Sequence, residues 1–277
     1  MTSFAPIPRD VLGCIVAGYE KGGTTLVKDL VRRACRMRGC FEGGLLLTHS
    51  PAEGIPEPYA TQLVQSWALP ATFFDEYRAC RTFEEGYRLL RERSDNVLHR
   101  HRPLIDKTPR YTMHLDAVLR RAPTTPVVVV IREPALVAGS WVRLGRTPVD
   151  AVDAIRLSTA GLARVAAVED GIDRVYLLRL DDLTADTQGT LDAVAAWLGS
   201  PPRPLDPDML VGTPDPSGRH QTGIDRERSG AARDLDPGLI AEIDAAVQAA
   251  GSDLAWVRSL RTGPLAAAPS PVPPTRG

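Results

Sequence analysis

Residues 11–26 read VLGCIVAGYEKGGTTL, and this stretch decides the fold. Its first half is an apolar run that ends in glycine, which is typical of a strand buried on both faces. The sequence then predicts a helix over residues 24–38, because Leu26 and Leu30 fall on one face and Lys28 lies among the basic side chains of the other. A strand, a glycine-rich turn and a helix in this order form the opening unit of an α/β domain.

The rest of the chain continues this alternation of strands and helices. Strands are predicted within 39–47 and over 104–106, 127–131 and 175–180, and helices over 59–100, 110–121, from Pro134, over 148–168, 184–198 and from Pro237 to about 250. The run VVVVI at 127–131 is apolar throughout, as expected for a central parallel strand. Together the elements predict an α/β fold of three layers with a mostly parallel central sheet.

The length of 277 residues is that expected for one domain. We predict a single domain over residues 1–262. The segment 263–277 is rich in Pro and Ala and almost uncharged, so we predict a disordered tail. Residues 200–235 carry many Pro, Gly and Asp and few apolar residues, which predicts a long irregular segment.

Charge and hydropathy exclude several classes of protein. The net charge is −1, so there is no general basic field for nucleic acid or an anionic membrane. The N-terminus has no secretory pattern, and no stretch reaches the roughly 18 apolar residues of a membrane span. The four cysteines have neither Cys-x-x-Cys nor zinc-finger spacing, so we expect free thiols and no metal site. These observations predict a soluble cytoplasmic protein.

The basic residues are divided unevenly between lysine and arginine. Lys21, Lys28 and Lys107 are the three lysines, so arginine supplies 30 of the 33 basic side chains. Abundant arginine and alanine with few lysines indicate a GC-rich bacterial genome. Because lysine is rare in this chain, the position of each one is informative.

The glycine-rich turn at residues 18–26 is a candidate phosphate site. Backbone N–H groups and the dipole at a helix N-terminus bind anions, and glycine lets the backbone approach a phosphate closely. The phosphate loop of nucleoside triphosphatases reads G-x-x-x-x-G-K-S/T. Gly18 and Gly23 have this spacing, but Thr24 stands in place of the lysine, which is displaced to position 21. A plain structural turn is the alternative interpretation.

Two other motifs place a cation at the end of a predicted strand, where open α/β sheets bind ligands. Arg132 comes directly after residues 127–131, and Ser140 follows eight residues later. The two could hold a second phosphate if the chain bends back between them. Lys107 stands at the end of the short strand predicted over residues 104–106. The alternatives are that Arg132 pairs with Glu133 or caps the strand, and that Lys107 is a solvated surface lysine.

These segments together resemble the sulfotransferases that use PAPS, 3′-phosphoadenosine 5′-phosphosulfate. KGGTT at 21–25 resembles the family's 5′-phosphosulfate loop, P-K-x-G-T-T. Arg132 to Ser140 has the spacing of its 3′-phosphate motif, R-D-P-x-x-x-x-x-S. KTP at 107–109 resembles the K-S/T-P segment of the carbohydrate and protein-tyrosine branches.

A later segment extends the resemblance. RLDDL at 179–183, followed by a helix that ends in WLG, resembles R-Y-E-D-L and F-L-G of the family. The motifs occur in the right order over about residues 11–200 and imply a P-loop NTPase-like sulfotransferase fold. The two phosphate motifs each depart from the family at one residue, because Glu20 replaces the usual Pro and Glu133 the usual Asp.

The resemblance implies a role for each matched residue. Lys21 would contact the 5′-phosphosulfate and its bridging oxygen, and Lys107 the transferring sulfate. The nucleotide site would consist of Lys21, Gly22, Gly23, Thr24, Thr25, Leu26, Arg132 and Ser140. The C-terminal loop R-K-G-x-x-G of the cytosolic branch has no clear copy. Its nearest equivalent contains Arg219 and Gly223, which would fold over the nucleotide or form a solvated basic loop.

An acceptor hydroxyl needs a base to take its proton. The carbohydrate and protein-tyrosine branches place a glutamate just after the second strand, which points to Glu42. Its carboxylate would require partial burial or a neighbouring lysine. His49 is the alternative base, because the cytosolic branch uses histidine. A turn carboxylate and a loop histidine without catalytic roles are the remaining interpretations.

The predicted activity is sulfuryl transfer from PAPS, with PAP as product, to a small-molecule, glycan or natural-product acceptor. Sulfate carries less charge than phosphate, so fixed cations can serve and no metal is required. A small-molecule kinase and a silent nucleotide- or glycan-binding module are the alternatives, although Thr24 argues against the kinase. The acceptor and the oligomeric state, including a homodimer, stay open, and no nucleic acid or membrane partner is expected.

Overall fold

The architecture is taken from a computed structural model, which describes residues 4–97, 99–168, 171–205 and 235–268. Within these ranges, five strands form one sheet in the order β2-β1-β3-β4-β5. The strands are β1 (Leu12–Gly18), β2 (Leu104–Lys107), β3 (Val127–Ile131), β4 (Val175–Arg179) and β5 (Gly263–Pro264). The first four are parallel, and only β5 pairs antiparallel, with β4. The predicted mostly parallel α/β sheet is confirmed.

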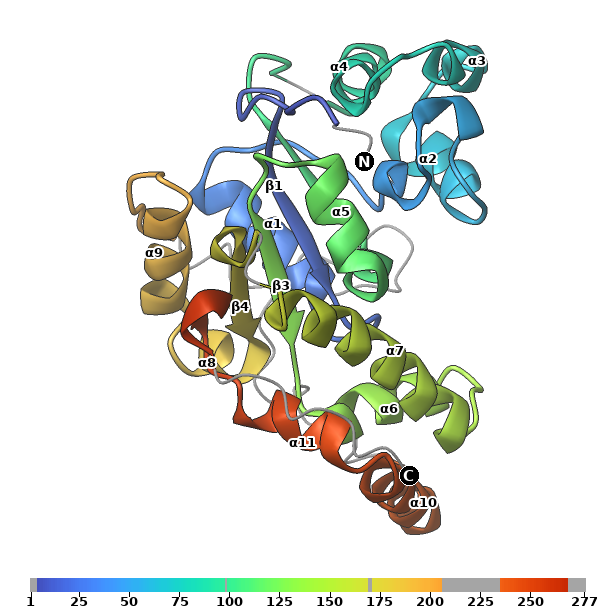
Figure 1. The fold of residues 1–277 in the computed structure, drawn as a ribbon, viewed down its shortest axis with the longest axis vertical. Helices are drawn as coiled ribbons and strands as arrows, with labels where there is room; N and C mark the ends of the chain where they lie inside the picture. The colour runs from blue at the N-terminus through green and yellow to red at the C-terminus, as the bar shows by residue number, and fades with distance from the viewer. Residues whose placement is uncertain (1–3, 98, 169–170, 206–234, 269–277) are drawn as a thin grey trace.

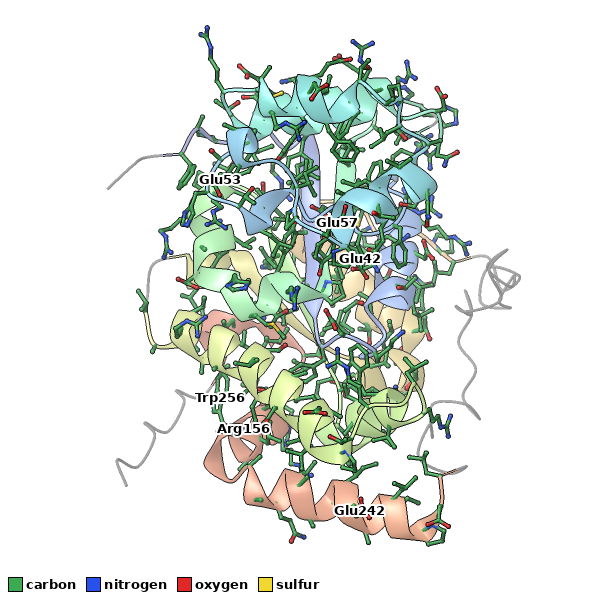
Figure 2. All side chains as sticks on the ribbon, turned by 90° about the vertical axis from the view of Figure 1, so that its right-hand side faces the viewer. Glu42, Glu53, Glu57, Arg156, Glu242 and Trp256 are labelled. Carbon is green, nitrogen blue, oxygen red and sulfur yellow. The ribbon has the colours of Figure 1, made fainter. Side chains whose placement is uncertain are left out.

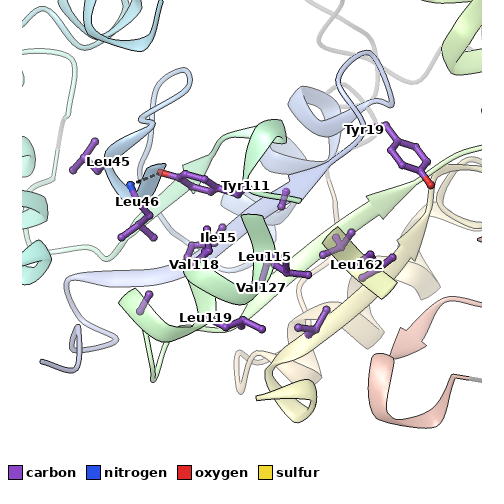
Figure 3. Packing of buried hydrophobic residues seen from close by; sticks show 14 of the residues in the cluster. Ile15, Tyr19, Leu45, Leu46, Tyr111, Leu115, Val118, Leu119, Val127 and Leu162 are labelled. Atoms are coloured by element: carbon purple, nitrogen blue, oxygen red, sulfur yellow. Dashed lines mark hydrogen bonds between the residues drawn. The ribbon is translucent and has the colours of Figure 1, made fainter. Parts of the chain in front are cut away.

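Helices cover both faces of this sheet and complete the three layers (Figure 1). One face packs against α1 (Thr24–Ala34) and α9 (Thr187–Trp197), and the other against α5 (Leu115–Arg121) and α7 (Pro148–Ala166). In β3, Val127 and Val129 join the core on the α5–α7 side. Figure 3 shows Leu115 and Val118 of α5 near Val127. Val128 and Val130 join the core on the α1 side.

Three short helices form a cap at one end of the molecule (Figure 1). They are α2 (Tyr59–Trp67), α3 (Phe73–Arg78) and α4 (Phe83–Arg93). The prediction of helical structure for residues 59–100 is confirmed, but the segment is divided into three separate helices. The aromatic residues Phe73, Tyr77, Phe83 and Tyr87 are buried, as expected of packing residues.

The remaining helices lie between and after the strands. They are α6 (Pro134–Val142), α8 (Leu180–Ala185), α10 (Pro237–Ala249), α11 (Ser252–Ser259) and the short 3₁₀ turns Leu45–Leu47, Pro51–Glu53, Pro109–His114, Ile172–Arg174 and Leu265–Ala267. The helix predicted over 110–121 divides into a 3₁₀ turn and α5, and that predicted over 184–198 is α9, preceded by α8. The described part of the chain contains no helix both long and apolar enough to cross a membrane.

The strand predicted within 39–47 is wrong. Arg38 makes an isolated parallel bridge to Leu104, and the chain then leaves the sheet. Gly44 adopts a left-handed conformation (φ 69°) that starts the 3₁₀ turn Leu45–Leu47. The free edge of β2 is therefore bordered by an irregular loop, which we call the 40–46 loop.

The tail predicted from residue 263 starts too early. Gly263 pairs with Leu177 of β4, and the side chain of Leu265 is buried. The preceding residue fixes this segment, because the hydroxyl of Thr262 donates to the Asp182 carboxylate at 2.6 Å and accepts from the Arg179 N–H at 3.0 Å. Residues 269–277 lie outside the described residues.

Candidate active site

The turn between β1 and α1 leaves the first amides of the helix without a side-chain cap. Gly23 is the N-cap in a left-handed conformation (φ 93°), and no side chain bonds to the helix end there. A Cβ at this position would lie 2.8 Å from a methyl group of Leu180, so the close approach of α8 requires glycine. The Gly22 N–H donates to the Tyr19 carbonyl at 2.9 Å and closes the turn. Uncapped amides at a helix N-terminus are suited to an anion.

Lys21 stands at the exposed tip of this turn, also with a positive φ of 64°. Its Nζ lies 5.8 Å from the ring centroid of Trp141 in α6, and the guanidinium of Arg146 lies 3.7 Å from the same ring. Thr24 is buried at the start of α1, where Thr25 is half-buried. Two cations thus lie on one aromatic ring beside the candidate phosphate site.

The second lysine of interest, Lys107, forms an ion pair with Glu42 at 2.8 Å. The Lys107 side chain is 1% exposed and that of Glu42 16%. The Nζ also lies 4.0 Å from the ring centroid of Phe41. Burial lowers the pKa of Lys107, and the Glu42 carboxylate opposes this shift. The interpretation of Lys107 as a solvated surface lysine is wrong, and the structure brings together the two residues that the resemblance selected.

The third lysine, Lys28, was predicted on the solvent side of the first helix, and this prediction is wrong. It is buried, and its Nζ donates to the Cys40 carbonyl at 2.7 Å and pairs with Asp29 at 2.9 Å. Lys28 therefore supports the segment that carries Glu42. The scarcity of lysine was the signal that could have drawn attention to it.

Arg132 leaves the end of β3 as a buried side chain at the carboxyl edge of the sheet. Burial lowers the pKa of Arg132, and Asp181 opposes this shift. The next residue, Glu133, accepts from the guanidinium of Arg258 in α11, whose Nε lies 2.9 Å from the Glu133 carboxylate. Ser140 is half-buried in α6, where its hydroxyl donates to the Leu136 carbonyl at 3.0 Å.

Glu20 lines a cavity of about 400 Å³ beside the phosphate turn. The cavity walls are formed by Glu20, Arg110, Met113, Arg146, Asp150, Asp153, Ala154 and Leu157. Burial and the nearby Glu42 carboxylate raise the pKa of Glu20, while Arg110 and Arg146 oppose the shift. The walls therefore carry charges of both signs, and the volume is that of a small-molecule site.

The other predicted residues are not joined to this group by the described contacts. His49 is exposed, its Nδ1 lies 3.2 Å from a guanidinium nitrogen of Arg121, and its N–H donates to Glu53 at 3.1 Å. In Figure 2, Glu53, the partner of His49, lies apart from Glu42. Arg219 and Gly223 lie outside the described residues.

No group of three or more metal-binding side chains was found in the ranges that the structure describes. The cations around the turn and the strand ends are instead Lys21, Lys107 and Arg132. Fixed cations of this kind can bind phosphate and sulfate groups directly.

Comparison with solved structures identifies similar folds. The sulfotransferase domain of the Synechococcus PCC 7002 olefin synthase matches with a TM-score of 0.61 at 19% identity, over 90% of this chain and 95% of that domain. The sulfotransferase domain from the curacin biosynthetic pathway matches with a TM-score of 0.55 at 18% identity, over 91% and 99%. These likenesses establish a sulfotransferase fold.

Comparison of sequences gives the family. No curated protein matches the chain. A family model described as the sulfotransferase family matches residues 14–204, which includes the phosphate turn and the carboxyl ends of β1 to β4. The match covers well over half of the chain. The chain therefore belongs to the sulfotransferase family.

Proposed function

We propose that this protein transfers a sulfuryl group from PAPS to a hydroxyl or amine of a small-molecule, glycan or natural-product acceptor, and releases PAP. Membership of the sulfotransferase family supports the type of group transferred. The donor is inferred from the residues of the site.

One observation carries the proposal: three neighbouring parallel strands end in the proposed donor and transfer residues. The phosphate turn follows β1, Lys107 ends β2 on one side of it, and Arg132 follows β3 on the other. Since parallel strands end at the same edge, the three groups lie along one edge of the sheet, where open α/β sheets bind ligands. A donor with two separate anionic groups and a transferring sulfate needs cations at several points of this kind.

The nucleotide would be held by the residues on either side of β1. The uncapped amides after Gly23, together with Thr24 and Thr25, would bind the 5′-phosphate. Arg132 would bind the 3′-phosphate, the group that distinguishes PAPS from ATP. Ser140 would join it by turning its hydroxyl, which donates to the Leu136 carbonyl within α6, so that it donates to a phosphate oxygen instead.

In the transfer step, the acceptor oxygen forms a bond to sulfur while the bond from sulfur to the 5′-phosphate oxygen breaks. Glu42 takes the acceptor proton, and Lys21 stabilises the negative charge on the leaving oxygen. Lys107 holds the Glu42 carboxylate in place at 2.8 Å. The cavity lined by Glu20 and Arg110 lies next to this point and would receive the acceptor.

Two alternative functions differ in what they bind and convert. A small-molecule kinase would bind ADP as well as PAP, and Thr24 occupies the place of the lysine that its phosphate loop requires. A silent binding module would bind PAP without turnover. Calorimetry with PAP and ADP tests the first alternative, and a transfer assay with PAPS over a panel of alcohols, phenols, sugars and amines tests the second.

The Arg132→Ala variant tests the donor. We expect it to weaken PAP binding by about 2–4 kcal/mol, the cost of removing a charged contact and leaving its partner unpaired. The affinity for ADP, which lacks the 3′-phosphate, should hardly change. The exposed Arg120→Ala variant is the matched control, because Arg120 pairs with Asp116 on α5. Equal losses for PAP and ADP would show that Arg132 does not read the 3′-phosphate.

A further inference from the structure

The 40–46 loop is held by side chains rather than by strand pairing. Seven hydrogen bonds join its backbone to side chains from elsewhere in the chain: Lys28 to Cys40, Thr108 and Asp106 to Gly43, Thr108 to Gly44, Tyr77 to Leu45, Tyr111 to Leu46 and Arg121 to Leu46. Figure 3 shows one of them, the bond from the Leu46 N–H to the Tyr111 hydroxyl. Buried backbone groups need such partners when no strand supplies them.

The hydroxyl of Thr108 is the centre of this support. It accepts from the N–H of Gly43 at 3.2 Å and of Gly44 at 3.0 Å, and donates its one hydrogen to Oδ1 of Asp106 at 3.0 Å. A hydroxyl has one donor and two acceptor positions, so all three are used. This accounts for a Ser or Thr between the lysine and proline of the K-S/T-P segment.

Asp106 fixes the direction of that hydroxyl. It is buried, and its Oδ2 accepts from the hydroxyls of Tyr87 at 2.6 Å and Tyr111 at 2.7 Å. Burial raises the pKa of Asp106, and these hydrogen bonds oppose the shift. With its acceptor sites occupied by donors, the carboxylate orients Thr108 toward the loop.

The backbone at Gly43 packs closely against the Asp106 carboxylate. A Cβ on Gly43 would lie 2.9 Å from Oδ1 of Asp106, so the backbone approaches the carboxylate as nearly as glycine allows. Glu42 is the residue directly before it, and Thr108 directly follows Lys107. The two members of the ion pair are therefore each adjacent to a residue of the Asp106–Thr108 network.

We propose that Asp106 and Thr108 are positioning residues for the transfer reaction, which hold the 40–46 loop so that Glu42 meets Lys107. The proposal rests on the proposed function for the catalytic meaning of Glu42. A purely structural role is the alternative, in which the network stabilises the fold but does not determine the Glu42–Lys107 contact. The two differ in what happens to Lys107 when the Thr108 hydroxyl is removed.

The ionisation of Lys107 can be measured without any substrate, so this test is independent of whether PAPS is the donor. The chain has three lysines, and protein labelled with ¹³C and ¹⁵N at lysine gives one side-chain NMR signal for each. Lys21→Arg and Lys28→Arg assign the Lys107 signal by elimination. The charged groups that act on Lys107 are Glu42 and Asp106, which raise its pKa, and Lys28, which lowers it.

We expect Glu42→Gln to lower the pKa of Lys107, which gives the reference for a lost pair. Thr108→Val should lower it by at least half as much, although it changes no charge. Thr108→Ser keeps the hydroxyl and should leave the pKa at the wild-type value. Tyr87→Phe is the control, because it removes a hydroxyl whose hydrogen is donated to Asp106 rather than to the loop.

The outcomes decide between the two roles. A pKa of Lys107 that is unchanged or raised in Thr108→Val would overturn the proposal, as would equal shifts in Thr108→Val and Tyr87→Phe. Thr108→Ala replaces Thr108→Val if the valine variant does not fold, since it removes the hydroxyl without placing a methyl group against the Gly43 and Gly44 amides. The same pKa criteria then apply to it.

Discussion

The Glu42→Gln variant leaves Lys107 buried without the carboxylate that it contacts, and we expect its free energy of unfolding to fall by about 2–3 kcal/mol at neutral pH. The change keeps the shape of the side chain and a carbonyl oxygen that can still accept from Nζ. It therefore removes the charge of the partner more than the hydrogen bond. The effect measures how strongly the fold depends on this ion pair.

The magnitude follows from burial. Breaking a buried ion pair by removing one partner costs about 3–5 kcal/mol, because an uncompensated charge stays in the interior. Lys107 meets this condition at 1% exposure, but Glu42 is 16% exposed and water reaches part of it. The retained acceptor reduces the cost further, since a hydrogen bond from a charged donor stabilises by about 1.5–3 kcal/mol.

The cost should depend on pH in a defined direction. Burial lowers the pKa of Lys107 from its ordinary 10.5 in the folded protein, so the folded state disfavours the charged lysine. In the wild-type protein, the contribution of Lys107 to the free energy of unfolding is lowest at pH values below its pKa in the folded state. This contribution rises as the pH increases from that pKa toward 10.5, the ordinary pKa of lysine. Glu42→Gln lowers the folded pKa further. The difference between the two proteins is therefore full where Lys107 is charged in both and disappears once Lys107 is neutral in both.

Urea unfolding at a series of pH values from 7 to about 10 measures this difference. Glu57→Gln is the matched control, because Glu57 is an exposed glutamate whose carboxylate accepts from the Thr61 N–H in the first turn of α2. We expect the control to change stability by less than about 0.5 kcal/mol. A Glu42→Gln cost as small as that of the control, or one that does not decline as pH rises, would refute the reasoning.

The remaining predictions concern turnover. Lys21→Ala should reduce kcat by about 10²–10³-fold with an unchanged circular dichroism spectrum, because it removes a donor to the leaving oxygen from an exposed turn; near-normal kcat would show that the turn is structural only. Once an acceptor is found, Glu42→Gln should reduce kcat strongly and His49→Ala should not. The reverse result would make His49 the base and would contradict the assignment to the branches that use glutamate.

The sheet could be predicted because its central strands are short runs of apolar residues. Parallel strands covered on both faces consist of unbroken apolar residues, and the run at 127–131 coincides with β3. The glycine-rich turn and the helix after it follow from local chemistry at Gly23. The family resemblance then selected Glu42 and Lys107 from separate segments, and the structure brings them together at 2.8 Å.

The 40–46 loop could not be predicted in this way, because nothing local determines it. An apolar run such as GGLLL is typical of a strand, and only contacts distant in sequence exclude that outcome. Its amides bond to Thr108 and Tyr111, more than sixty residues later. The position of the last strand has the same kind of cause, since Thr262 is fixed by Asp182.

The three lysines show what composition can and cannot reveal. Rarity drew attention to Lys107, but helical periodicity placed Lys28 on the solvent face, although it supports Cys40 in the loop that carries Glu42. Lysine ends in a compact ammonium group on a flexible stem, whereas the planar guanidinium of arginine needs room for its fork. The slot between the Phe41 ring and Glu42 admits such a point charge in almost complete burial. In a chain that otherwise uses arginine, two of the three lysines therefore stand where a small buried cation contacts a particular oxygen, and both of those oxygens belong to residues 40–42.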